Sequence, residues 1–339
     1  MKFLICGLGS IGKRHMENLE SLGFSCNDIS IFRTRKGTAN FGDKTLENHG
    51  NRHAIFYNLQ DALAGQPDVV FITNPTSLHI PIAIEAASAG CHLFIEKPLS
   101  HTMTDIDTLI EIVARKKIIA FVGYNRRFHP LLQQMKNWLV TEQIGKVASI
   151  HAQMSERITD WHPWENYKIS YATRSDLGGG VILTQCHELD YLYSLFGKPK
   201  WIFAAGGELG NFEIEVEDTC KSILEFKNNV IASLHVDYLK RPAAGFLEIT
   251  GTTGRIRWDC LGRTANLIPI KGEVISITDP ILKPGDSWIA NTYLIELAYF
   301  LNCIRSGIQP LPDLKQGKDV LEMLLATKKS LTNKQLVYL

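Results

Sequence analysis

The chain has 339 residues, of which 45% are hydrophobic and 21% are charged, and its formal net charge is +1. This balance is typical of a globular protein, and it excludes a low-complexity chain and a strongly basic nucleic-acid-binding surface. Because a single core tends to stop growing near about 250–300 residues, two domains are predicted. No apolar run is long enough for a signal peptide or for the ~20 residues of a membrane span, so a cytoplasmic protein is expected.

The first predicted element is a short apolar strand over residues 2–6, and a helix is predicted over 12–22. Between them stands GLGSIG, whose glycines have the GxGxxG spacing of a tight turn that lets the backbone approach a pyrophosphate. The positive end of the helix would stabilise that phosphate group. The loop residues expected to bind a dinucleotide are Gly7, Gly9, Ser10, Ile11 and Gly12.

The second predicted strand, residues 29–32, ends where the adenosine ribose of such a cofactor lies. An NAD site usually places an acidic residue there, whereas this chain has Arg33, Thr34, Arg35 and Lys36. Guanidinium groups match the geometry of a phosphate, so the sequence favours NADP over NAD, with the first three as cofactor-binding residues. The alternative is that these residues are solvated loop charges.

Further buried-type strands are predicted over 68–73, 92–95 and 118–122, as a doubly wound parallel sheet requires. Thr76 or Ser77 is expected to cap the helix that follows the first of them. Ligands of such sheets bind at the carboxyl ends of the strands. Tyr124 is expected to contact the substrate, and the residues that this rule places beside the cofactor are Asn74, Pro75, His79, Glu96, Lys97, Asn125 and Arg126.

Five motifs in this order resemble the family of glucose-fructose oxidoreductase, inositol 2-dehydrogenase and MocA. They are GLGSIG at 7–12, PTSLH at 75–79, EKP at 96–98, NRRF at 125–128 and GGGVILTQCHELD at 178–190. The resemblance implies an α/β protein with an N-terminal Rossmann domain over 1–122. It implies a C-terminal α/β domain over 123–339, whose large, mostly antiparallel open sheet borders the substrate and forms a homodimer or homotetramer.

The resemblance also implies that Lys97 and His187 are the active-site residues. A secondary alcohol gives up a hydride as its hydroxyl proton departs, so the site needs a base and a positive group. His187 would be the base and Lys97 the positive group, while Glu96 either orients Lys97 or binds the ribose. The family usually has an aspartate four residues before this histidine. Here that position is Leu183, so Thr184 or Gln185 is expected to contact the substrate instead.

Alternating strands are predicted over 147–155, 220–226, 229–239 and 245–259, as in a sheet with one buried face. The aromatic loop after the first of these strands suits a sugar ring, although its rings could instead anchor the loop on the core. The predicted sugar contacts are Trp161, Tyr167 and Arg174. One helix is predicted over 181–197. Two C-terminal helices, over 288–305 and 314–329, are predicted as packing elements, with packing against the first domain as one option.

Seven scattered cysteines without a CxxC pair predict neither a disulfide framework nor a zinc site. His15, His129 and His235 have no companions at metal-ligand spacing, so no metal is predicted. The sequence thus predicts an NAD(P)-dependent oxidoreductase that interconverts an alcohol and a ketone on a sugar, cyclic polyol or nucleotide-activated sugar. Two alternatives remain: a reductase of a conjugated double bond or imine, and a non-catalytic NADPH sensor, which would need neither Lys97 nor His187.

Overall fold

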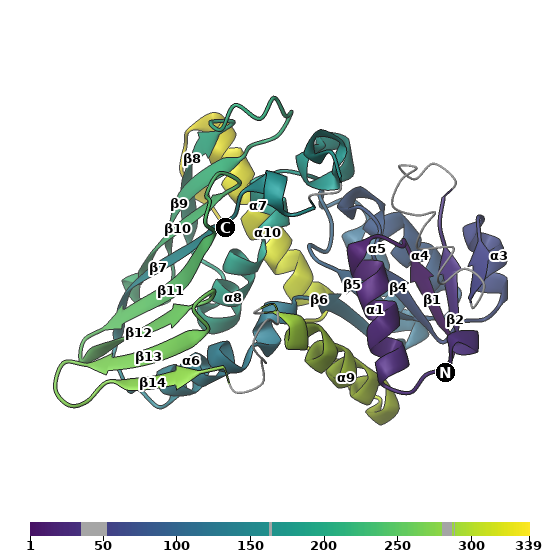
Figure 1. Ribbon diagram of the computed structural model, residues 1–339, viewed down its shortest axis with the longest axis horizontal. Helices are drawn as coiled ribbons and strands as arrows, with labels where there is room; N and C mark the ends of the chain where they lie inside the picture. The colour runs from purple at the N-terminus through teal and green to yellow at the C-terminus, as the bar shows by residue number, and fades with distance from the viewer. Residues whose placement is uncertain (35–52, 163–164, 280–286, 288) are drawn as a thin grey trace. The chain divides into compact units, whose positions relative to one another are not determined.

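The computed structural model describes residues 1–34, 53–162, 165–279, 287 and 289–339 (Figure 1). Arg35, which is predicted to bind the cofactor, and the neighbouring Lys36 lie outside these residues. The chain divides into two compact units: unit 1 is Met1–Gly123 with Tyr293–Lys318, and unit 2 is Tyr124–Thr292 with Asp319–Leu339. Within the described ranges, no helix has the length and apolar character that crossing a membrane requires.

Unit 1 contains a six-stranded parallel sheet with the strand order β3-β2-β1-β4-β5-β6. Both β1 and β4 consist entirely of buried residues, as expected for strands covered on both faces. The predicted doubly wound parallel sheet is therefore confirmed. The strands are β1 (Phe3–Cys6), β2 (Ile29–Phe32), β3 (Ala54–Phe56), β4 (Val69–Ile72), β5 (His92–Glu96) and β6 (Ala120–Gly123).

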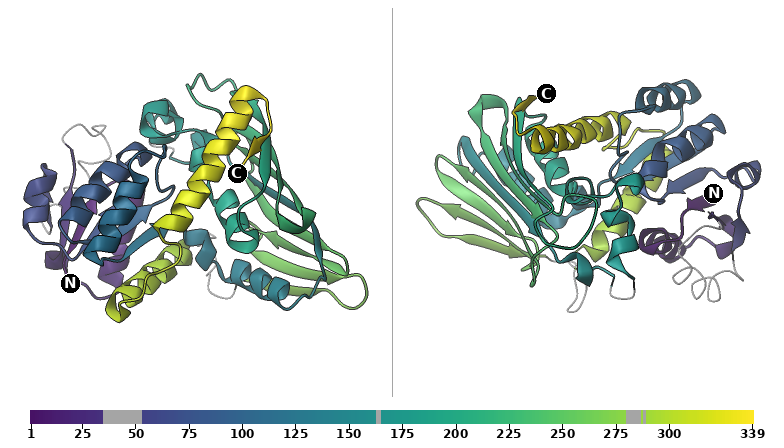
Figure 2. Two further views of the ribbon diagram at one scale, coloured as in Figure 1. Left: turned by 180° about the vertical axis from the view of Figure 1, so that it is seen from behind. Right: turned by 90° about the horizontal axis from the view of Figure 1, so that it is seen from above.

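Helices cover both faces of this sheet, with α1 and α9 on one face and α4 and α5 on the other (Figures 1 and 2). Phe300 of α9 packs on the sheet, with ring centroids 5.4 Å from Phe94 and 5.7 Å from Phe121. The helices are α1 (Ser10–Ser21), α3 (Leu59–Ala64), α4 (His79–Ser88), α5 (Ile106–Lys116) and α9 (Ala290–Ser306), and α10 (Leu314–Asn333) begins in this unit.

The start of α4 differs from the prediction. Thr76–Leu78 form a 3₁₀ turn, η2, which continues directly into α4, and the residue before α4 is Leu78, which offers no side-chain cap. The expectation that Thr76 or Ser77 caps this helix is wrong, because the turn takes the place of the cap: the N–H of Leu78 donates to the carbonyl of Pro75.

Unit 2 contains a nine-stranded sheet with the order β14-β13-β12-β11-β7-β10-β9-β8-β15. Only the pair β7 and β10 is parallel among its described pairings, which confirms the predicted, mostly antiparallel sheet. The strands are β7 (Val147–Ser155), β8 (Trp201–Gly207), β9 (Thr219–Glu225), β10 (Ile231–Asp237), β11 (Ala244–Gly251), β12 (Gly254–Asp259), β13 (Thr264–Pro269), β14 (Ile275–Thr278) and β15 (Val337–Tyr338).

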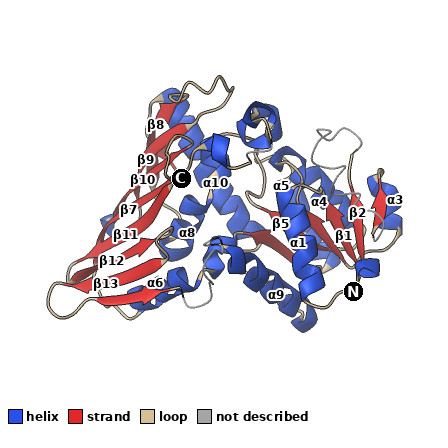
Figure 3. Cartoon of the chain, viewed as in Figure 1, coloured by secondary structure: helices blue, strands red, loops and turns tan. Residues whose placement is uncertain are grey.

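Buried and accessible residues alternate along these strands, so the sheet has one buried face. In Figure 3, α6 (Pro130–Val140), α8 (His187–Phe196) and α10 lie along this sheet on the same side. The opposite face keeps apolar side chains accessible on three neighbouring strands: Phe203, Ile223 and Ile231 are each 39% exposed.

The helix predicted over 181–197 is two helices, α7 (Val181–Thr184) and α8, so the single-helix prediction is wrong. The backbone leaves helical geometry at Gln185, with φ −91° and ψ 46°. The glycines before α7 also have a structural reason. Gly180 has φ +106°, and a Cβ there would collide with the carboxylate of Glu217, which accepts a hydrogen bond from Ile182 N–H at 3.3 Å.

Candidate functional site

The glycine loop of unit 1 forms a cradle that leaves no room for a side chain at Gly12. Gly7 has φ +97°, and a Cβ at Gly12 would collide with the carbonyl oxygen of Gly7. A Cβ at Gly9 would meet nothing within 4 Å, so open space lies in front of the backbone there. Thr73 fixes the turn by donating from Oγ1 to the carbonyls of Cys6 and Gly7 at 2.9 and 2.7 Å.

The same loop opens α1, whose first residues are the predicted Ser10 and Ile11. Gly9 precedes the helix and provides no side-chain cap, so the first N–H groups of α1 remain available to an anion. The cradle therefore fits the pyrophosphate of a dinucleotide such as NAD or NADP.

Arg33 follows β2, and its backbone N–H donates to the carbonyl of Phe56 at 3.1 Å. Its Nη1 atom is buried and has no hydrogen-bond partner within the described part of the chain. Thr34 beside it is exposed. A guanidinium group with an unused N–H can donate a hydrogen bond to a phosphate oxygen.

His79 connects two loops at the carboxyl edge of the sheet. Its Nδ1 lies 2.9 Å from the carbonyl oxygen of Pro98, and its Nε2 lies 2.9 Å from that of Asn74. Burial lowers the pKa of His79, and the two carbonyl contacts oppose this shift. His79 is only 1% exposed, so in these contacts it holds the loops that carry Asn74, Pro75 and the EKP motif.

Glu96, the last residue of β5, holds the backbone of Lys97. Its Oε2 accepts the N–H of Lys97 at 3.1 Å, and its Oε1 hydrogen-bonds to Nε2 of His15 at 2.7 Å. Glu96 is 5% exposed, whereas Lys97 is half-buried. These contacts support the alternative in which Glu96 orients Lys97.

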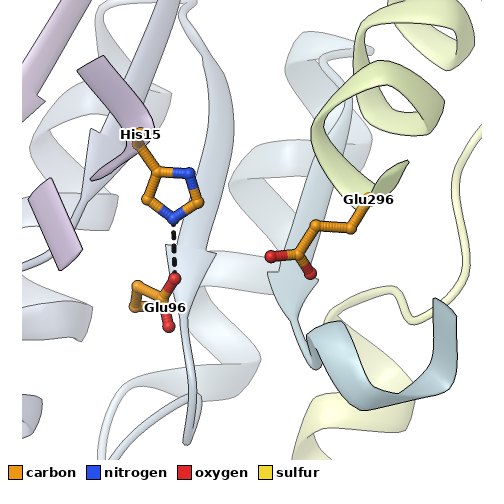
Figure 4. A group of neighbouring side chains, drawn as sticks. All are labelled: His15, Glu96 and Glu296. Atoms are coloured by element: carbon orange, nitrogen blue, oxygen red, sulfur yellow. Dashed lines mark hydrogen bonds and ion pairs between the residues drawn. The ribbon is translucent and has the colours of Figure 1, made fainter. Parts of the chain in front are cut away.

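His15 and Glu96 form a buried group with Glu296 of α9 (Figure 4). One ligand atom of each residue lies within 4.8 Å of the others, and such a set of donors is one that a divalent cation accepts. The prediction that His15 lacks companions considered spacing along the chain, but in space it has two. Tyr293 lies beside His15, with ring centroids 6.2 Å apart, and burial raises the pKa of Tyr293 to about 12.

In unit 2, two consecutive arginines of the turn η3 (Asn125–Phe128) meet the first turn of α8. Arg126 pairs with Glu188, and Arg127 donates to Asp190 from Nη2 at 2.7 Å and from Nε at 3.0 Å. All four residues are buried. Burial opposes the charge of both arginines, yet the carboxylates opposite them raise the pKa of each above its usual value.

The residues predicted at the end of β6 make contacts inside unit 2. Tyr124 is fully buried, and its ring centroid lies 5.7 Å from Cζ of Arg127. Asn125 donates from Nδ2 to Oγ1 of Thr292 at 2.7 Å. The structure thus engages Asn125 and Arg126, which the sequence assigned to the cofactor, with partners in unit 2.

His187 is the first residue of α8 and is 5% exposed. Gln185, two residues earlier, donates from Nε2 to Oε2 of Glu156 at 3.2 Å. Thr184 donates from Oγ1 to the carbonyl of Gly180 at 2.6 Å. His187 and Gln185 therefore come together at the break between α7 and α8.

The three predicted sugar contacts have different surroundings. Tyr167 donates to the carbonyl of Phe212 at 3.3 Å, which supports the loop-anchoring alternative for this residue. Arg174 pairs with Asp176 at an exposed position. Trp161 packs edge-on against Tyr238 at 5.2 Å, and its buried Nε1 has no hydrogen-bond partner among residues with a described position.

Several residues that position these groups were missed from the sequence. Glu188 and Asp190 stand within the motif HELD and could have been paired with the two arginines of NRRF. Thr73 directly follows β4, where a polar residue at a strand end was a usable signal. The others belong to elements far apart in the chain and leave no local signal: His15, Glu156 and Glu296.

Comparisons with known proteins agree with this architecture. Residues 1–124 match the model described as an oxidoreductase family with an NAD-binding Rossmann fold, and residues 132–257 match the GFO/IDH/MocA C-terminal domain. The chain is 27% identical over 358 aligned positions to myo-inositol 2-dehydrogenase of Thermotoga maritima, covering 100% of this chain and 98% of that protein. It is 25% identical over 335 positions to scyllo-inositol 2-dehydrogenase (NAD(+)) of Bacillus subtilis, covering 97% and 93%.

Two solved structures resemble the chain over its full length. A probable dehydrogenase from Thermotoga maritima matches with a TM-score of 0.79 and 25% identity, covering 100% of this chain and 99% of that one. Levoglucosan dehydrogenase, in complex with NADH and levoglucosan, matches with a TM-score of 0.85 and the same coverage. Its identity is 20%, so this likeness concerns the fold.

Proposed function

Because the chain belongs to the GFO/IDH/MocA family of oxidoreductases, we propose that it interconverts an alcohol and a ketone on a cyclic polyol or sugar. Its relatives named above act, by their names, on inositols. The observation that carries the proposal is the hydrogen bond that Glu96 accepts from the backbone N–H of Lys97. Both residues lie at the carboxyl edge of a Rossmann sheet whose glycine cradle fits a dinucleotide.

The cofactor is held by the cradle residues Gly7, Gly9 and Gly12 and by the N-terminus of α1. When bound, the nicotinamide ring supplies the acceptor or donor of the hydride. We favour NADP over NAD on the strength of Arg33, whose Nη1 is buried without a partner in the described structure. In contrast, the Bacillus subtilis relative carries NAD(+) in its name, so the choice needs a direct test.

In the direction of oxidation, His187 accepts the proton of the substrate hydroxyl group, and the ammonium group of Lys97 stabilises the negative charge that forms on the oxygen. The carbon then loses a hydride and becomes the carbonyl carbon of the ketone. Glu96 keeps Lys97 in place through its backbone N–H. The pairs formed by Arg126 and Arg127 fix the helix turn that carries His187.

We also propose that the protein is a homodimer or homotetramer. The open face of the nine-stranded sheet presents Phe203, Ile223 and Ile231, which are paired neighbours or near neighbours on β8, β9 and β10. Exposed apolar groups that lie together on a surface favour association.

The test begins with the wild-type protein, NAD or NADP, and a panel that contains inositols, levoglucosan and simple sugars. Replacing Lys97 by alanine is expected to lower kcat by about 10²–10³-fold, because the developing charge loses its partner. Cofactor binding, followed by nicotinamide fluorescence, should persist. Lys200→Ala is the control, because Lys200 is an exposed lysine that pairs with Glu225.

Two results would contradict the proposal. An unchanged kcat in Lys97→Ala would remove Lys97 from the reaction. Reduction of a conjugated double bond or imine by a His187→Ala variant at the wild-type rate, with no turnover of any polyol or sugar, would establish the alternative reductase instead.

A further inference from the structure

A histidine of the helix that follows the glycine cradle reaches the residue that holds Lys97. His15 lies in the second turn of α1 and is fully buried. Its Nε2 lies 2.7 Å from Oε1 of Glu96, the last residue of β5 (Figure 4). An ionised carboxylate offers only acceptors, so Nε2 of His15 is the donor of this hydrogen bond. A side chain of α1 is therefore joined to the EKP motif.

Packing holds the ring of His15 in place. Its centroid lies 4.7 Å from that of Phe94, edge-on, and 5.4 Å from that of Phe71. Tyr293 of α9 adds a third ring, edge-on at 6.2 Å. Within the described residues, Nδ1 of His15 has no hydrogen-bond partner, so the imidazole bonds to Glu96 alone. The three aromatic neighbours restrict the imidazole, which presents Nε2 to Glu96 in a fixed direction.

Glu96 has one oxygen for each of its two neighbours. Oε1 accepts from His15, and Oε2 accepts the backbone N–H of Lys97 at 3.1 Å. The adjacent strand leaves room for this side chain: Gly123 is the β6 partner of Glu96, and a Cβ there would lie 2.9 Å from the ring of Phe94 and 3.4 Å from Oε1. Glu96 is 5% exposed, so without His15 a buried carboxylate oxygen would lose its donor and the side chain would turn toward another one.

We propose that His15 is a positioning residue of the reaction, which sets the direction of the Glu96 carboxylate and thereby the place of Lys97. The inference rests on the proposed function. His15 belongs to the helix whose N-terminus fits the pyrophosphate, so two hydrogen bonds link that helix to the lysine that stabilises the alkoxide. A small displacement of a catalytic group can cost a factor of about 10² in rate. His15 thus contributes to kcat although it is buried away from any ligand.

The experiment compares two replacements of His15. His15→Leu keeps an apolar side chain among the aromatic rings and removes the donor, whereas His15→Gln keeps an N–H group that can donate to the carboxylate. For a polyol that the wild-type protein oxidises, kcat is expected to fall by about 10–100-fold in His15→Leu and by less than about threefold in His15→Gln. KM for the polyol and the Kd of the cofactor, followed by nicotinamide fluorescence, should change by less than about threefold in both variants.

A double variant separates positioning from a general structural role. If His15 acts through Lys97, His15→Leu should lower kcat by less than about twofold once Lys97 has been replaced by alanine. Two independent roles would instead multiply the two losses. Circular dichroism and thermal unfolding check that each variant is folded.

His53→Leu is the matched control. His53 is another buried histidine of unit 1, 6% exposed, and its Nδ1 lies 3.1 Å from the carbonyl oxygens of Cys26 and Ile29. Ile29 is the first residue of β2, so these contacts lie at the amino end of that strand, opposite the edge that carries Lys97. This variant should lose stability while kcat stays at the wild-type value.

The possible failures can be told apart. If the wild-type protein oxidises the polyol and His15→Leu keeps its kcat, the positioning role is overturned while the proposed function stands. The role is also overturned if His15→Leu weakens cofactor binding as much as it lowers kcat, or if its loss multiplies with that of Lys97→Ala, because His15 then supports the fold alone. If the wild-type protein oxidises no polyol or sugar with either cofactor, the proposed function and this inference are both overturned.

Discussion

Arg127 donates from both Nε and Nη2 to the carboxylate of Asp190, 63 residues farther along the chain. This pair and its neighbour, Arg126 with Glu188, connect η3 to the first turn of α8. No side-chain cap precedes α8, and the first turn of an uncapped helix has unsatisfied N–H groups. The two ion pairs therefore hold the helix end on which His187 is placed.

Removing one member of the buried pair should be costly. In Asp190→Ala the guanidinium group of Arg127 stays buried without its carboxylate, so the free energy of unfolding is expected to fall by about 3–5 kcal/mol. Urea unfolding measures this change. Arg174→Ala, which breaks the exposed pair with Asp176, should leave the free energy of unfolding close to the wild-type value. Equal losses in the two variants would contradict the buried role of Asp190.

The glycine cradle predicts opposite effects for two neighbouring substitutions. Gly12→Ala should disturb the turn itself, because its Cβ would collide with the carbonyl of Gly7, so both thermal stability and cofactor affinity should fall. Gly9→Ala has open space and φ −77°, so stability should be preserved. Its methyl group would nevertheless stand where a pyrophosphate approaches, and cofactor affinity should fall by about tenfold or more. Wild-type affinity in Gly9→Ala would place the cofactor elsewhere.

Arg33 predicts the choice of cofactor. Titration of the pure protein with NADPH and with NADH, followed by nicotinamide fluorescence, should show tighter binding of NADPH. Arg33→Ala is expected to weaken NADPH binding by about 10–100-fold, as for the loss of a charged hydrogen bond, and to leave NADH binding nearly unchanged. If the wild-type protein binds NADH equally well or better, Arg33 does not bind the extra phosphate of NADP and the substrate screen belongs with NAD.

His79 predicts a loss of stability in mild acid. Burial lowers its pKa from the usual 6.5, so the folded protein binds fewer protons than the unfolded chain as the pH falls through and below that value. The free energy of unfolding should therefore decrease as the pH drops below about 6.5. The decrease should be shallower in His79→Gln than in the wild type, measured by urea unfolding at several pH values. His151→Gln, at an exposed position, should keep the wild-type slope. Parallel curves for wild type and His79→Gln would remove His79 as the cause.

Local sequence patterns predicted the strands that have a regular pattern of apolar residues. The predicted bounds of β2, with its apolar residues Ile29, Ile31 and Phe32, and of the alternating strand β7 agree with the structure, because period and burial determine these strands. The partners of several site residues depend instead on contacts between segments that are far apart in the chain. Arg126 stands in a motif at a strand end and was assigned to the cofactor, yet a carboxylate 62 residues away engages it. Likewise, His15 and Glu96 are 81 positions apart, so no argument based on local spacing could predict their hydrogen bond.

The division of the chain has a consequence for protein synthesis. Each unit is built from two separate stretches, and the helix that brings Phe300 onto the parallel sheet is encoded after residues 124–292. A nascent chain therefore exposes the aromatic side chains of Phe94 and Phe121 until almost the whole polypeptide has left the ribosome. Closing so long a connection adds an entropic cost that a contiguous domain would not have. For this chain, a fragment that stops after the sixth strand is an unfinished domain, with part of its core open to aggregation or to chaperones.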